Sequence, residues 1–133
     1  MSPRRRRLPE HLVGPARAFD DLLPPLGRAE AALTGAVPGT RLPGRPLAET
    51  LSEFEDGLRE VRDGMEAWRS PDIETEWEAC SRGLDEALAL ADRVRTEGAH
   101  PEAFEGLIGL IGDLLAPLDA FDAASARFGE LRG

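Results

Sequence analysis

The sequence contains few of the side chains on which disulfide formation, metal binding and most catalysis depend. Among 133 residues there are one cysteine and two histidines, while lysine, tyrosine, asparagine and glutamine are absent. With a single cysteine, Cys80, the chain can form no intramolecular disulfide. The fold therefore depends on an apolar core, and a domain of this length is large enough to bury one. All sixteen basic residues are arginine, which we interpret as a compositional bias of high-GC bacterial genomes.

Long apolar runs are also missing. The most apolar window, from Phe104 to Leu118, is interrupted by Glu105, Asp113 and several glycines, so it is too short and too polar to cross a bilayer. The arginine run near the N-terminus is followed by Leu8-Pro9-Glu10 and not by an apolar segment, unlike a secretion signal. We therefore expect a cytoplasmic protein without a membrane segment.

The negative charge is concentrated in the body of the chain. The formal net charge is -9, and Arg4, Arg5, Arg6 and Arg7 contribute +4, so the rest carries -13. Such a body repels phosphate backbones and lipid headgroups, which argues against a nucleic-acid or membrane-surface role for it. We predict that residues 1–7 form a disordered basic tail and residues 8–133 a single helical-bundle domain. The four arginines are the candidate tether if nucleic acid is bound.

Apolar periodicity predicts the fold class. One stripe with spacings of three and four residues runs from Leu47 to Trp68, and a second runs from Ile73 to Val94. The short connections near Ser70 and His100 join successive antiparallel helices. We therefore predict an all-α, antiparallel up-and-down helical bundle that resembles a four-helix bundle, with three long helices and a proline-broken N-terminal helix.

Prolines set the expected helix boundaries. Pro24-Pro25 should divide the first element into residues of about 9–22 and 25–34, with Leu23 and Pro24 extended or kinked. Residues 35–45 read as a linker with two turn signals. The long helices are expected to begin near Pro46, Pro71 and Pro101, and Pro117 should kink the last one.

Residues 103–121 are apolar over more than one narrow stripe. A helix with so wide an apolar face has to contact two or more neighbours. We therefore expect this segment to form the central wall of the bundle.

Two sets of glycines are candidates for helix–helix interfaces. Gly57 and Gly64 align on one flank of their predicted helix, which indicates close approach of another helix, although glycine there can also be merely tolerated. Gly106, Gly109 and Gly112 project away from the apolar arc and form either a solvated face or a contact surface. Because the broken first helix covers the bundle imperfectly, these faces lead us to predict a homodimer.

Aromatic side chains gather at one predicted end of the bundle. Antiparallel pairing brings the following five apolar residues to that end: Met65, Trp68, Trp77, Phe121 and Phe128. Aromatic residues at helical spacing usually pack together as core, so we expect a solid plug. The alternative is a small-molecule pocket that opens near Ser70.

No motif indicates catalysis or cofactor binding. Glu97 and His100 have the spacing of a carboxylate–histidine metal pair, but Gly98 and Pro101 place them in a turn. Cys80 lies in a core stripe, where a thiol is usually inert. We predict no metal, no cofactor and no enzymatic activity. Asp122 borders the apolar face, so we expect it either to find an arginine or capping partner or to mark a site.

The leading hypothesis is a non-enzymatic acidic helical protein that acts in protein–protein interaction or homo-oligomeric assembly. The first alternative is a small-molecule-binding bundle that uses the aromatic end near Trp68 and Trp77. The second is a nucleic-acid-associated protein tethered by residues 4–7, against which the acidic body argues.

Overall fold

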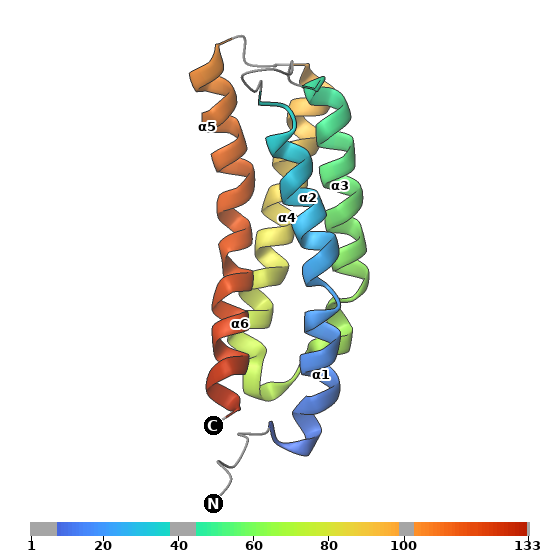
Figure 1. The fold of residues 1–133 in the computed structure, drawn as a ribbon, viewed down its shortest axis with the longest axis vertical. Coiled ribbons are helices and arrows are strands. Elements are labelled where there is room, and N and C mark those ends of the chain that lie inside the picture. Colours follow the sequence, from blue (N-terminus) through green and yellow to red (C-terminus); the bar gives the residue numbers. More distant parts are fainter. Residues whose placement is uncertain (1–7, 38–44, 99–102, 133) are drawn as a thin grey trace, which may run out of the picture.

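The computed structural model describes residues 8–37, 45–98 and 103–132, and in these ranges it shows an all-α antiparallel bundle, as predicted. Helices α1 (Glu10–Asp20) and α2 (Leu23–Thr34) run in one direction, and α3 (Leu47–Asp63) returns. Then α4 (Glu74–Glu97) follows the first direction, and α5 (Phe104–Leu115) and α6 (Ala120–Leu131) return (Figure 1). Three 3-10 segments lie at the junctions: η1 (Met65–Trp68), η2 (Pro71–Ile73) and η3 (Ala116–Asp119).

The N-terminal element is divided as predicted, but its break is helical and not extended. Leu23 and Pro24 are the first residues of α2, and Leu22 before them has right-handed helical dihedral angles. Prolines fit the first turn because the N–H groups of that turn have no partner inside the helix. Of the two alternatives predicted for Leu23 and Pro24, the extended one is not observed, whereas the helix axis does change direction at this point (Figure 1).

The second long helix ends earlier than predicted. The apolar stripe continues to Trp68 and is buried from Leu51 onward, but α3 stops at Asp63 and the chain tightens into η1 after Gly64. The pattern alone did not reveal this change, because 3-10 and α-helical turns bury nearly the same positions over one turn.

Pro117 divides the last helix into α5 and α6. The junction is η3, and α4 accommodates it through Gly83: a Cβ atom at that position would overlap the carbonyl oxygen of Pro117. A glycine therefore lets the irregular backbone lie directly on α4. The kink at Pro117 was predictable from the sequence, but its contact with Gly83 was not.

Residues 103–121 are not the central wall of the bundle. Ile111 and Leu114 are buried, but Leu107 and Leu110 are half-buried and Ile108 is 44% exposed. The central position belongs to α4, which contacts α3 as well as α5, η3 and α6. The prediction was wrong because apolar width shows how much surface a helix could bury, not how much its neighbours cover.

Close approach of α2 to α3 depends on two glycines. A Cβ atom at Gly57 would lie 2.8 Å from the Cβ of Ala29 and 3.2 Å from the carbonyl oxygen of Pro25. A Cβ atom at Gly64 would overlap the side chain of Leu22. The flank that carries both glycines is thus occupied by α2 of the same chain.

We expect Gly57→Ala to lower the free energy of unfolding by about 1–3 kcal/mol, because the added methyl group has to displace α2. Gly109→Ala is the matched control. It lies inside α5 with open space around a Cβ atom, so higher helix propensity should stabilise the protein by up to about 1 kcal/mol. Urea denaturation measures both changes, and equal stabilisation by the two variants would contradict the observed contact.

Candidate functional site

The aromatic end is packed around a residue that sequence analysis did not include. The ring of Phe19 lies 5.0 Å from that of Trp68 and 5.2 Å from that of Phe128, centroid to centroid. Phe121 stacks on the same ring at 6.4 Å. Phe19 was missed because it comes from α1, whose packing partner the broken sequence pattern did not reveal.

The two tryptophans have different surroundings. Trp68 is fully buried, and its Nε1 has no hydrogen-bond partner among the described residues. Its ring meets that of Phe19 edge to face, a favourable aromatic geometry. Trp77 lies outside this cluster: its Nε1 donates to the carbonyl oxygen of Met65 at 2.8 Å, and Arg69 covers its ring at 4.2 Å.

The five residues of the candidate ligand pocket are therefore divided between the cluster around Phe19 and the surroundings of Trp77. None of the five is more than 9% exposed, and the four aromatic rings contact side chains of the same chain. This geometry favours the solid plug over the small-molecule pocket.

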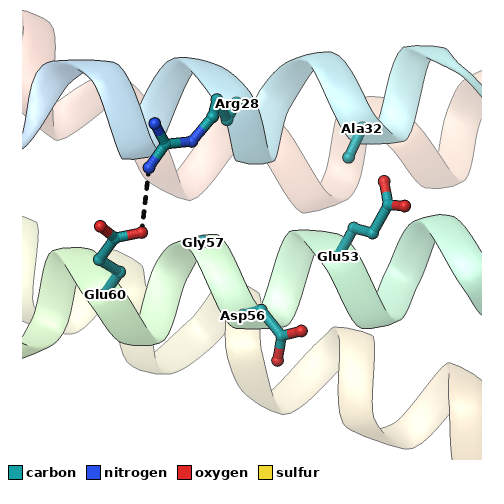
Figure 2. A pocket seen from close by; sticks show the side chains of 6 residues that line it. All are labelled: Arg28, Ala32, Glu53, Asp56, Gly57 and Glu60. Atoms are coloured by element: carbon teal, nitrogen blue, oxygen red, sulfur yellow. Dashed lines mark hydrogen bonds and ion pairs between the residues drawn. The ribbon is translucent and has the colours of Figure 1, made fainter.

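A shallow groove lies instead between α2 and α3 and has a volume of about 290 Å³. Figure 2 shows the residues that line it: Arg28, Ala32, Glu53, Asp56, Gly57 and Glu60. This volume is near the lower limit of typical ligand pockets, which also have mainly apolar walls. Apart from Gly57, which was a candidate for a helix–helix interface, the residues of the groove could not be predicted from the sequence, because its two walls come from different helices.

The carboxylates of the groove already have arginine partners. Glu60 accepts a hydrogen bond from Arg28 across the groove at 3.1 Å. Glu53 pairs with Arg45 at 2.5 Å, and this pairing lowers the pKa of the Glu53 carboxyl below its ordinary value. These groups are exposed, so the pairs contribute little to stability. A ligand would have to displace an arginine to use these carboxylates.

Glu55 is the one buried carboxylate among the described residues. The residue is only 2% exposed, although it lies outside the apolar stripe of its helix. It accepts from Arg59 at 3.1 Å and from Arg95 of α4 at 2.9 Å. The carboxylate therefore joins α3 to α4, and both of its partners reach out to solvent.

The remaining predicted residues are not gathered into a site. Gly106, Gly109 and Gly112 are exposed, and the latter two have open space where a Cβ atom would be. Arg4, Arg5, Arg6 and Arg7, and also His100, lie outside the described residues. Within the described ranges no group of three or more histidine, cysteine, aspartate or glutamate residues is arranged to hold a metal ion. Those ranges also contain no helix long and apolar enough to span a membrane.

Asp122 belongs to a group of carboxylates that form no ion pair with any described residue. Glu30 of α2 is half-buried and close enough to Asp122 and Asp119 to be affected by their charges. Desolvation and these two charges, in that order, raise the pKa of the Glu30 carboxyl above its ordinary value. The position of Asp122 was unusual in the sequence, but Glu30 could not be predicted beside it, because the two residues come together only across the bundle.

Comparison with family models, with curated proteins and with solved structures gives no match to this chain. Functional inference therefore depends on the geometry of the chain itself.

We expect Glu30→Gln to raise the melting temperature at pH 7. The native state binds the Glu30 proton more tightly than the unfolded chain does, so stability falls as pH rises from the ordinary glutamate pKa through the raised one. The gain should vanish below about pH 4, where both states are protonated. Calorimetry across this range measures it. Glu86→Gln, an exposed change on α4, is the control, and an equal gain from it would contradict the assigned cause.

The reactivity of the Cys80 thiol shows whether reagents reach the core of the bundle. Desolvation, with a smaller contribution from Glu76, raises the pKa of the Cys80 thiol to about 12, and the residue is fully buried. A disulfide reagent at pH 8 should label the protein only after denaturation, because the thiolate reacts and both burial and this pKa suppress it. Cys80→Ala should cost about 1 kcal/mol of stability. Rapid labelling of the native protein would show that the core opens.

Proposed function

We propose that this chain is a non-enzymatic interaction protein that uses α5 to contact another protein or a second copy of itself. The observation that carries the proposal is the incomplete burial of α5. Ile108 is 44% exposed, and Leu107, Leu110 and Leu115 are only half-buried. These apolar side chains are neighbours on one short helix.

Isolated exposed apolar residues are normal on soluble proteins and need no explanation. Among the described residues, Val13 of α1 and Leu23 of α2 are the other large apolar side chains classed as exposed. The situation on α5 differs because the exposed and half-buried side chains are adjacent along one helix, and contiguous apolar surface is typical of interaction sites. The aromatic end, by comparison, is filled by its own rings.

The assembly test measures the mass of the full chain by light scattering at micromolar concentration. If a second copy covers α5, the wild type should be a dimer and Ile108→Asp a monomer, because the new carboxylate would be buried in the interface. Val13→Asp is the control: an equally exposed valine on α1 should tolerate the change with no loss of assembly.

Thermal unfolding of the same variants tests whether α5 is a free surface. Ile108→Asp should change stability by no more than about 0.5 kcal/mol, as is usual for exposed positions. A loss of several kcal/mol would show that Ile108 belongs to the core, and the proposal would then be wrong. A monomeric wild type with a stable Ile108→Asp variant would exclude the predicted homodimer and leave another protein as the partner.

A further inference from the structure

On one side of the bundle, between α2 and α5, the helix backbones approach each other at few points. Helix α2 packs closely on α3, and α4 packs on α3 and on the column formed by α5, η3 and α6, whereas α2 and α5 make few contacts. In Figure 1 the α5–α6 column stands at the left, α1 and α2 lie to its right in front of α4, and α3 lies at the right. The loosely packed side is thus the one between α2 and α5.

Helical spacing identifies the side chains of α2 on this side. Arg28 and Ala32 lie on the flank that faces α3 (Figure 2). Glu30 lies on the opposite flank, because it is affected by Asp119 and Asp122. Leu23 precedes Glu30 by seven residues, which places it on the same flank. It is 39% exposed.

On the α5–η3–α6 side of this surface, apolar residues come first along the chain and acidic residues follow. Ile108 and Leu115 are seven residues apart on α5 and share one flank of that helix. Asp119 and Asp122 follow on η3 and α6, where they approach Glu30. We call this surface the α2–α5 seam and define it by six residues: Leu23, Glu30, Ile108, Leu115, Asp119 and Asp122.

The seam has a single sign of charge. The chain contains no arginine or lysine between Arg95 and Arg127, so the α5–η3 wall has no basic residue of its own. Arg28 is already paired with Glu60, and Arg127 with Glu130. Glu30, Asp119 and Asp122 form no ion pair with any described residue. Desolvation is the larger cause of the raised pKa of the Glu30 carboxyl, and the charges of Asp122 and Asp119 add to it.

The negative charge of the seam distinguishes between two possible occupants, a second copy of the chain and a partner of different sequence. A second copy would bring the same three carboxylates toward the seam, and like charges placed opposite each other across an interface oppose association. A basic partner would neutralise them and at the same time cover Leu23, Ile108 and Leu115. Charge complementarity therefore favours a partner of different sequence.

We propose that the α2–α5 seam binds a basic amphipathic helix of another protein, with apolar residues against Leu23, Ile108 and Leu115 and with lysine or arginine against Glu30, Asp119 and Asp122. This inference rests on the proposed interaction function and specifies its partner. Such a ligand follows the helix-in-groove mode, in which apolar anchors recur at spacings of three and four residues. A ligand of about 12 residues, or three turns, would match the length of α5.

The test uses the full chain and a fluorescent synthetic peptide of about 18 residues made of leucine, alanine and lysine. Leucine is placed at spacings of three and four residues, with lysine on both sides of that stripe. A scrambled peptide of the same composition is the first control. Fluorescence anisotropy measures affinity at low and at physiological salt, because exposed charge pairs weaken as salt rises.

Three variants separate the seam from the general acidity of the chain. Asp119→Asn with Asp122→Asn removes two seam charges without changing shape, and Ile108→Asp disrupts the apolar part. The charge-matched control is Asp63→Asn with Glu86→Gln, which removes two exposed charges from α3 and α4. Circular dichroism melting verifies that each variant folds.

We expect the seam charge variant to bind the ordered peptide about tenfold more weakly than the wild type does, and Ile108→Asp to lose most of the binding. The control variant should stay within about twofold of the wild type, and the scrambled peptide should bind weakly to all. Equal losses in the seam and control variants, or equal binding of both peptides, would show diffuse attraction and overturn the inference.

Two outcomes would overturn this inference while leaving the proposed function intact. Loss of binding in Ile108→Asp with no change in the seam charge variant would show an apolar contact without basic recognition. A wild-type dimer that does not bind the peptide would show that a second copy occupies the seam. The proposed function itself fails only if Ile108→Asp unfolds the chain as a core substitution would.

Discussion

Three glycines determine how closely the backbones of this bundle approach one another. Gly57 and Gly64 let α2 lie against α3, and Gly83 lets the irregular backbone at Pro117 lie against α4. At each point a single methyl group would meet another residue's atoms at less than normal contact distance. The closest approaches at these glycines therefore join α2 to α3 and η3 to α4, whereas Cβ atoms at Gly109 and Gly112 of α5 would meet no neighbouring atoms.

At the aromatic end, large side chains fill the distance between the α1–α2 column and the α5–α6 column. Phe19 reaches from α1 to Phe121 and Phe128 of α6 and to Trp68 at the end of η1. Large rings span the distance that small residues leave open, because one aromatic side chain buries as much surface as several aliphatic methyl groups. Aromatic side chains thus fill the space between α1 and α6, whereas apolar and acidic side chains line the side between α2 and α5.

This difference connects the architecture to function. The carboxylates Glu30, Asp119 and Asp122 border apolar side chains and have no arginine opposite them among the described residues, although arginine pairs with many carboxylates elsewhere in the bundle. Desolvation of Glu30 is the larger cost to the stability of the isolated chain at neutral pH, and repulsion by Asp122 and Asp119 adds a smaller one. A basic partner would relieve this repulsion, so the same three charges that weaken the monomer would favour the complex.

The sequence by itself determined the helical class, the antiparallel order and most of the buried stripe positions, because apolar spacing and proline positions act locally along the chain. It also marked Gly57, Gly64 and Asp122 as unusual. Only the tertiary structure decided that Phe19 is the centre of the aromatic cluster, that Glu55 is buried between α3 and α4, and that α5 lies at the side of the bundle. Each of these depends on which helices become neighbours and how closely they approach, and a periodic pattern contains no information about either.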